Sequence, residues 1–296
     1  MPKRIHFNVG GVPEHFNLPW KKAIEEKQFE THSIEVSWKD YCGGTGAMTK
    51  ALREGDLDVA ILLTEGIIAD IHRGNKSKIV QFYVKSPLRW GVHVGAQSDF
   101  LNISDLENKK AAISRYGSGS HLMAYVNADN QNWDLSKQKF EVVKNLDGGR
   151  AYLTQGKADY FLWEKFTTKP FVDSGEFRII GECPTPWPSF VIAVREDVLL
   201  THYDEVKLLL ETVNESCKRV KENPKSVEEI AKRYDLKKED VAVWFEETEW
   251  AYNGSVESET IDKVQERLIS LEIVESKMNF RELCSPFNKE AKTTRS

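Results

Sequence analysis

Apolar and amphipathic segments alternate along the first part of the chain. Apolar and polar residues alternate within Ile5–Val9 and Ser33–Trp38, and Val59–Leu63 is apolar throughout. Between these runs, Leu18–Gln28 and Ala47–Arg53 have the composition of helices. This order of strand, loop and helix predicts a parallel sheet that is covered by helices on both faces.

The same order starts again after Ser86-Pro87. Ser104–Glu107 has a capping-box pattern that predicts a short helix. Beyond it, strands are predicted at Lys110–Ser114, Phe140–Lys144 and Tyr160–Trp163, and helices at Leu122–Asn130 and Gly148–Gln155. The chain is therefore expected to contain two α/β units, which also suits its length of 296 residues.

The two units share a short repeated pattern. Gly46–Asp58 leads through an apolar strand to Glu65, and Gly149–Asp159 leads through another to Glu164. Each copy is a small helix closed by glycine, then an Asp, a strand and a Glu. Two similar lobes would produce this pattern. Because few positions match, chance similarity is the alternative.

The last third of the chain has a helical pattern. Apolar residues fall on one helical face in two segments, namely Val206, Leu209, Leu210, Val213, Cys217 and Val220, and then Ile261, Val264, Leu268 and Leu271. Ser226–Glu229 is a second capping-box pattern. We expect this acidic segment to pack around one lobe, with its charges on a solvated outer face.

Charge and hydropathy exclude several classes of protein. The chain has 41 Lys and Arg against 46 Asp and Glu and no basic face, which argues against nucleic acid as a partner. No apolar run approaches the ~18–20 residues of a membrane span. Met1–Arg4 is followed by Ile5–Gly11 and not by an apolar leader segment. We therefore expect a cytoplasmic chain, or a periplasmic or secreted one only if a signal peptide was removed.

Neither metal nor cofactor motifs are present. The four cysteines, at positions 42, 183, 217 and 284, form no CxxC pair, and the seven histidines form no HExxH. Buried thiols in a reducing compartment are the expectation, without a metal site. The chain contains neither GxxxxGK[ST] nor GxGxxG, so no nucleotide cofactor is predicted.

The order of the glycine-rich loops and apolar strands resembles the type II periplasmic-binding-protein family. The resemblance is greatest to its branch of nitrate, sulfonate, taurine and thiamine-pyrimidine binders. It spans nearly the whole chain and rests on order, because each motif alone is common. The matching segments are Gly10-Gly11, Gly43–Gly46, Leu52–Asp58, Asp105–Lys110, Gly117–Ser120 and Gly156–Asp159.

This resemblance implies a two-lobed α/β fold with a ligand in the cleft between the lobes. The two crossing strands would lie near Leu88–Val94 and Phe190–Val194. Residues 1–88 and 193–296 would form lobe one, with the C-terminal helices packed on it, and 89–192 an inserted lobe two. Closure about the hinge would remove a small ligand from water.

Glycine-rich turns at strand ends are the first candidates for ligand contacts. Such a turn lets backbone N–H groups approach a ligand, and the following helix adds its partial positive end. The candidates in and near these turns are Gly11, Gly44, Thr45, Ser86, Ser118, Gly119, Ser120 and His121. For Thr45, Ser118 and Ser120, ordinary helix N-capping is the alternative.

Two carboxylates and two aromatic rings complete the candidate site. Glu65 and Glu164 follow apolar strands and would favour a ligand with N–H donors or positive charge, because an unpaired buried carboxylate is costly. The alternative is that each caps the next helix or points into solvent. Tyr116 adjoins the Ser-Gly loop and Trp187 precedes the second crossing. Either ring could stack on a flat heterocycle, with core packing as the alternative.

The sequence favours a non-catalytic protein that closes over a small nitrogen-containing metabolite, such as a thiamine-precursor pyrimidine. One alternative is a cytosolic enzyme on the same fold, similar to thiamine-pyrimidine synthesis enzymes or to menaquinone-pathway lyases, with His121 and Glu65 or Glu164 as acid and base. The Cys-rich cluster of the pyrimidine synthases has no counterpart here. A sulfonate- or taurine-like anion binder is the other alternative. The lack of a leader argues against a transporter partner, and the oligomeric state stays open.

Overall fold

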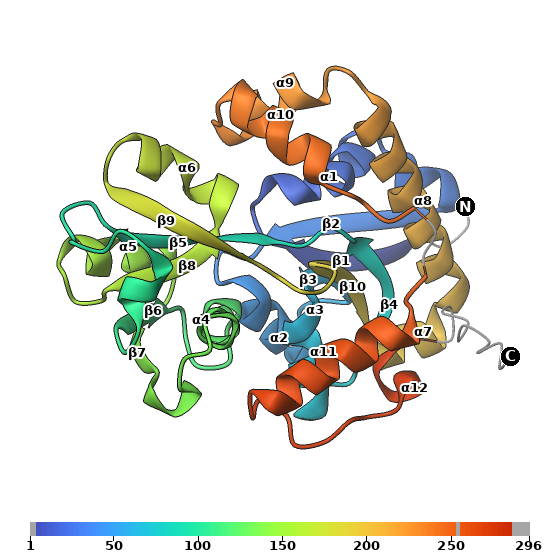
Figure 1. Cartoon of the computed structure of the whole chain (residues 1–296). Helices are drawn as coiled ribbons and strands as arrows, with labels where there is room; N and C mark the ends of the chain where they lie inside the picture. Colours follow the sequence, from blue (N-terminus) through green and yellow to red (C-terminus); the bar gives the residue numbers. More distant parts are fainter. Residues whose placement is uncertain (1–3, 253–254, 286–296) are drawn as a thin grey trace, which may run out of the picture. The chain divides into compact units, whose positions relative to one another are not determined.

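The computed structural model of the chain describes residues 4–252 and 255–285 (Figure 1). The chain divides into two units, of which unit 1 contains Met1–Ser86 and Trp187–Ser296 and unit 2 contains Pro87–Pro186. The sequence-based boundaries placed residues 87 and 88 in lobe one, whereas they lie in unit 2. The same boundaries placed residues 187–192 in lobe two. They lie in unit 1 because the strand that begins at Phe190 is hydrogen-bonded between two strands of that unit.

Unit 1 is built on a sheet whose strand order is β2-β1-β3-β10-β4. Three neighbouring strands, β2, β1 and β3, are parallel, and β10 is antiparallel to both β3 and β4. The strands are β1 (Ile5–Gly11), β2 (Ile34–Asp40), β3 (Val59–Leu63), β4 (Ser77–Val84) and β10 (Phe190–Arg195). Every residue of β3 is buried, as its uninterrupted apolar run predicts for a strand covered on both faces.

Helices cover this sheet, and the C-terminal third supplies many of them (Figure 1). The helix α8 packs against α1, and α11 packs against α3, which confirms the predicted packing of the C-terminal helices on lobe one. Their predicted apolar faces are buried. The helices are α1 (Leu18–Glu25), α2 (Gly44–Glu54), α3 (Thr64–His72), α7 (Glu196–Thr201), α8 (Tyr203–Glu222), α9 (Ser226–Tyr234), α10 (Lys238–Glu247), α11 (Ser258–Ser270) and α12 (Phe280–Leu283), with 3-10 turns η1 (His15–Asn17) and η2 (Gln28–His32).

Unit 2 repeats the plan of unit 1. Its sheet has the order β7-β6-β8-β5-β9, in which β7, β6 and β8 are parallel and β5 is antiparallel to both β8 and β9. The elements are β5 (Arg89–Gly95), β6 (Lys110–Ile113), β7 (Lys139–Val142), β8 (Tyr160–Glu164), β9 (Phe177–Pro184), α4 (Gly119–Asn130), α5 (Leu146–Thr154) and α6 (Lys165–Asp173), with 3-10 turns η3 (Ile103–Leu106) and η4 (Leu135–Lys137). In this plan β8 corresponds to β3, as the sequence repeat predicted.

Three local predictions were wrong. The capping box near residue 104 is formed by Asn102 and Asp105, two residues before the predicted pair. Ser226 is the first residue of α9 and not its N-cap, which is Lys225, and its hydroxyl donates to the Val220 carbonyl at 2.6 Å. Cys42 is exposed rather than buried, whereas the other three cysteines are buried as expected.

Candidate functional site

The N-termini of α2 and α3 lie close together at the carboxyl edge of the unit 1 sheet. The Thr45 hydroxyl near the start of α2 accepts a hydrogen bond from the Leu63 N–H at 3.1 Å, which ties this helix to the end of β3. A Cβ atom on Gly66 would lie 2.4 Å from Thr45 Cγ2. Glycine at this position therefore permits the close approach of α3 to α2. Gly44 begins α2 with a φ of +65°, a conformation that favours glycine.

Gly11, at the end of β1, lies in a crowded part of the same edge. A Cβ atom there would lie 2.7 Å from the Trp38 ring and from Asn17 Nδ2. Asn17 Oδ1 and the Tyr41 hydroxyl are buried and have no hydrogen-bond partner within the described residues. Asn17 and Tyr41 could not be predicted as candidates, since nothing in their sequence spacing distinguishes them from ordinary loop residues.

Glu65 is the most unusual polar group at this edge. Its side chain is in the first turn of α3 and the residue is only 1% exposed. Oε2 accepts a hydrogen bond from Trp187 Nε1 at 2.8 Å, whereas Oε1 is buried without a partner in the part of the chain that the structure describes. Burial raises the pKa of Glu65 to about 7, and its hydrogen bonds offset part of this rise.

The start of α3 also holds the segment by which the chain returns from unit 2. The Thr64 hydroxyl donates to the Pro188 carbonyl at 2.6 Å, and its N–H donates to the Ser189 carbonyl at 3.1 Å. Together with the bond from Trp187 to Glu65, these bonds join residues 187–189 to the first two residues of α3. Trp187 itself is 5% exposed, so its indole lies in the packed interior beside Glu65.

Ser86, at the end of the outgoing segment, has a structural part in unit 1. Its carbonyl accepts from the Ser189 hydroxyl at 2.8 Å, and its own hydroxyl accepts from the Glu249 N–H at 3.1 Å. These bonds join the outgoing and returning segments where they meet the sheet. A ligand contact for Ser86 stays a prediction.

In unit 2, three serines form a hydrogen-bonded group at the start of α4. Ser118 is the N-cap, and its hydroxyl accepts from the His121 N–H at 3.3 Å. The Ser120 hydroxyl accepts from the Ser114 N–H at 2.9 Å and lies 3.1 Å from the Ser118 hydroxyl. The capping alternative for Ser118 is therefore what the structure shows. Gly119 is the first residue of the helix.

Aromatic rings surround His121 on the same helix. Its ring makes edge contacts with Tyr116, Tyr125 and Phe140, at centroid distances of 5.3, 5.0 and 4.6 Å. Its Nδ1 accepts from the Gly117 N–H at 3.1 Å. Tyr116 is 66% exposed and so presents an aromatic face to solvent beside the serine group.

Glu164 differs from Glu65 in its bonding. It is the N-cap of α6, where Oε1 accepts from the Phe166 N–H at 3.1 Å and Oε2 from the Thr167 N–H at 2.6 Å. The capping alternative therefore describes its structure. Burial raises its pKa, and these two bonds oppose that shift. Any contact with a ligand stays a prediction.

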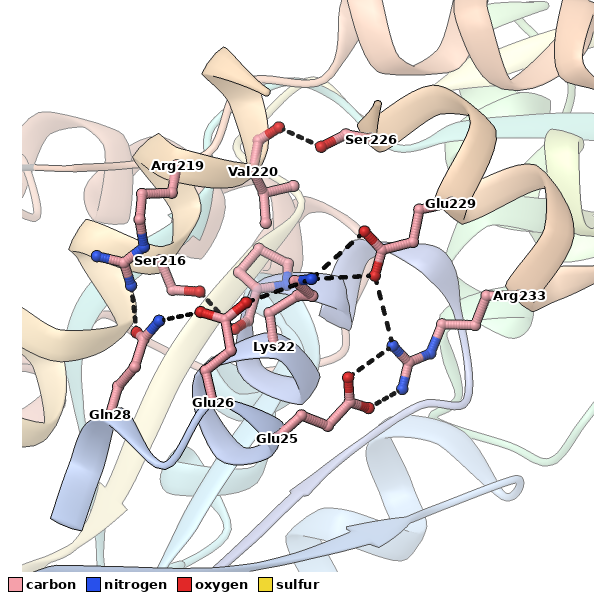
Figure 2. Close-up of polar contacts among 11 residues, drawn as sticks. Lys22, Glu25, Glu26, Gln28, Ser216, Arg219, Val220, Ser226, Glu229 and Arg233 are labelled. Atoms are coloured by element: carbon pink, nitrogen blue, oxygen red, sulfur yellow. Dashed lines mark hydrogen bonds and ion pairs between the residues drawn. The ribbon is translucent and has the colours of Figure 1, made fainter. Parts of the chain in front are cut away.

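A cavity of about 380 Å³ lies elsewhere in unit 1, among α1, α8 and α9. Figure 2 shows the polar contacts among the residues around it. Lys22 bridges Glu26 and Glu229, at 3.3 Å from each, and Arg233 contacts Glu229 and Glu25. Two of these pairs, Lys22 with Glu229 and Arg233 with Glu25, connect α1 with α9. We interpret the network as a structural link between the C-terminal helices and α1.

The described residues provide neither a metal site nor a membrane span. Residues 4–252 and 255–285 contain no group of three His, Cys, Asp or Glu side chains that could hold a metal ion. None of the helices in those ranges is long and apolar enough to cross a membrane.

A family model described as Ca3427-like PBP matches residues 90–183. No curated protein matches the chain. Among solved structures, the chain is similar to the CA3427 gene product of Candida albicans, with 28% identity, a TM-score of 0.85 and coverage of 94% of this chain and 92% of that one. That protein defines a new family with the generic periplasmic-binding-protein fold.

Two more distant structures share the fold. The alkanesulfonate-binding protein SsuA from Xanthomonas axonopodis pv. citri is 13% identical, with a TM-score of 0.80 and coverage of 98% and 100% of the two chains. The nitrate-binding protein NrtA from Synechocystis PCC 6803 is 14% identical, with a TM-score of 0.71 and coverage of 95% and 85%.

Proposed function

We propose that this chain, which has the type II periplasmic-binding-protein fold, binds a small nitrogen-containing metabolite, such as a thiamine-precursor pyrimidine. The fold is that of solute-binding proteins, which supports a ligand-binding role. The finer choice of ligand is supported by the chemistry of the residues at the carboxyl edge of unit 1.

The observation that carries the choice of ligand is the unpartnered oxygen of Glu65. A buried carboxylate oxygen without a donor costs about 1–3 kcal/mol, and Glu65 Oε1 is in this state within the described residues. A ligand N–H at this position would recover that cost, and a positively charged N–H group would recover more. An anion at the same position would be repelled by the ionised carboxylate.

The exposed ring of Tyr116 supports a flat ligand. This ring is 66% exposed and adjoins the serine group at the start of α4. Large exposed aromatic rings provide stacking surfaces for planar groups. We propose that unit 2 contributes this ring when the units close over the ligand, by a change in the segments at residues 86–87 and 186–187.

A thermal-shift screen tests the proposal. Aminopyrimidines, amines, amino acids and sulfonates are added separately to the purified chain, and a ligand that binds the folded state raises the melting temperature. We expect aminopyrimidines or other N–H-rich compounds to give the largest rise. Small-angle X-ray scattering with the same compound should show a smaller radius of gyration if the units close. A screen in which no class raises the melting temperature would contradict the proposal.

An anion binder of the sulfonate or taurine type is the second candidate. It is supported by the shared fold with an alkanesulfonate-binding protein and by the glycine-rich starts of α2 and α4, since helix N-termini attract anions. Taurine would then raise the melting temperature more than any aminopyrimidine.

A cytosolic location also stays a proposal, which cell fractionation of the source organism tests.

A further inference from the structure

We propose that Glu65 is a proton-linked anchor that selects a cationic N–H donor as the ligand, and that Trp187 is the positioning residue that holds this carboxyl group in place. This inference rests on the proposed function and states how that site would choose its ligand. On binding, the neutral carboxyl group loses its proton to the solvent, and the carboxylate accepts an N–H from the ligand.

The two oxygens of Glu65 differ in their surroundings. Oε2 is fixed by the indole N–H of Trp187, and Oε1 is buried without a partner among the described residues. The residue is at the carboxyl edge of the sheet, in the first turn of α3, whose N–H groups favour a negative charge. One oxygen therefore orients the group, and the other has an unused hydrogen-bonding capacity among the described residues, which we assign to the ligand.

The neighbouring elements supply no counter-charge to Glu65. Its hydrogen bonds within the described residues come from Trp187 and from its own backbone N–H, and β3 carries no charged residue. Most charged groups on the elements packed against α3 pair elsewhere, namely Arg53 with Asp70, Lys50 with Glu54, Lys78 with Glu196, Arg195 with Asp58 and Asp197, Lys263 with Glu259 and Glu266 with Lys277. On α11, Asp262 accepts a hydrogen bond from Gln265, and Arg267 lies in the last turn of the helix. His72, at the other end of α3, contacts Gln265 at 3.1 Å.

Several of these pairs also lie at the opposite edge of the sheet. Asp58 precedes β3, Lys78 is near the start of β4, and Arg195 ends the antiparallel β10. Glu65 follows the end of β3, a full strand length away. No charged group among the described residues is a cause of the pKa shift of Glu65, so a cationic ligand would supply a positive charge that this carboxylate lacks.

Proton linkage follows from the burial of the group. With the pKa of Glu65 at about 7, a cation that requires the ionised form would release roughly half a proton at pH 7. Its affinity would rise about tenfold between pH 6 and pH 8, because the ionised fraction rises by that factor. An anion that accepts from the neutral carboxyl group would show the opposite trend.

Isothermal titration calorimetry measures both quantities on the full chain. The probes are benzamidinium, which keeps its charge throughout this range, and taurine, each titrated at pH 6, 7 and 8. Two buffers with different ionisation enthalpies give the number of protons exchanged. The variants are Glu65→Gln and, as a matched control, Glu54→Gln, which removes a half-exposed carboxylate at the opposite end of α2.

We expect benzamidinium to release protons on binding the wild type and Glu54→Gln, and its affinity for both to rise tenfold between pH 6 and pH 8. We expect it to bind Glu65→Gln more weakly, without proton release and without a change of affinity with pH. Binding without proton release would overturn the inference and leave the proposed function intact. Failure of benzamidinium to bind, or tighter binding of taurine at low pH, would overturn the cationic ligand class. If no compound in the thermal-shift screen binds either, the proposed function also fails.

Trp187→Phe tests the positioning role. Loss of the indole donor removes a hydrogen bond that lowers the pKa of Glu65, so the pH range of the affinity change should move upward. A purely structural role for Trp187 would lower the melting temperature and leave that pH range unchanged, which would overturn its assignment as a positioning residue.

Discussion

The substitution Glu65→Gln should make the folded chain more stable at high pH, although it removes a hydrogen-bonded side chain. Burial raises the pKa of this carboxyl group from 4.5 to about 7. Below pH ~4.5 the group is protonated in both the folded and the unfolded chain, so it does not reduce the free energy of unfolding. As the pH rises through 7, the unfolded chain ionises first, and the contribution of Glu65 to stability is lost.

The size of this effect follows from the shift. A change of one pKa unit corresponds to about 1.4 kcal/mol, so a rise from 4.5 to about 7 amounts to about 3 kcal/mol. Glutamine has nearly the same shape, carries no charge and can still accept from the Trp187 indole. The free energy of unfolding of Glu65→Gln relative to wild type should therefore increase by about 3 kcal/mol between pH 4.5 and pH 8.

Urea unfolding of both proteins at several pH values measures this difference, because effects of all other titrating groups cancel between them. Glu54→Gln is the control, and its difference from wild type should stay nearly constant over the same range. A relative stability of Glu65→Gln that does not change with pH would refute the reasoning that Glu65 is buried without adequate partners.

Three further predictions concern stability. Gly66→Ala should destabilise unit 1 by about 1–3 kcal/mol in urea unfolding, because the new Cβ atom meets Thr45 Cγ2. Adding Thr45→Ser, which removes that methyl group, should restore part of the lost stability. A double variant that is no more stable than Gly66→Ala would contradict the contact. Glu164→Ala should cost about 1–2 kcal/mol in thermal unfolding through two uncapped N–H groups, and an unchanged melting temperature would disagree with the cap. Lys22→Met should lower the free energy of unfolding by less than about 1 kcal/mol, and this loss should shrink in high salt because the ion pair with Glu229 is screened. A loss of stability that does not depend on salt would indicate a packing effect instead.

The sequence predicted the strands well where burial decides the pattern. The run Val59–Leu63 coincides with β3, and the predicted repeat places β8 in the corresponding position of unit 2. The start of α1 was predicted correctly at Leu18, but two other helix starts were predicted too late, since α2 begins at Gly44 and α4 at Gly119. Glycine has a low helix propensity, so a glycine at a helix start is not recognised from composition.

The different roles of Glu65 and Glu164 could not be predicted. Both follow an apolar strand, but Glu164 is the last residue of β8 and the N-cap of α6, whereas Glu65 is the second residue of α3. An offset of two residues decides whether the carboxylate caps two following N–H groups, as that of Glu164 does, or reaches only its own backbone N–H, as that of Glu65 does. The partner of Glu65, Trp187, is 122 residues away in the sequence, and no local pattern encodes that contact.

Native mass spectrometry of the purified chain tests the central claim most directly, when it is combined with identification of the released small molecule. The account predicts one molecule per chain with exposed N–H groups, retained by the wild type and by Glu54→Gln but lost from Glu65→Gln. A sulfonate or another anion, retained equally by the wild type and Glu65→Gln, would contradict it.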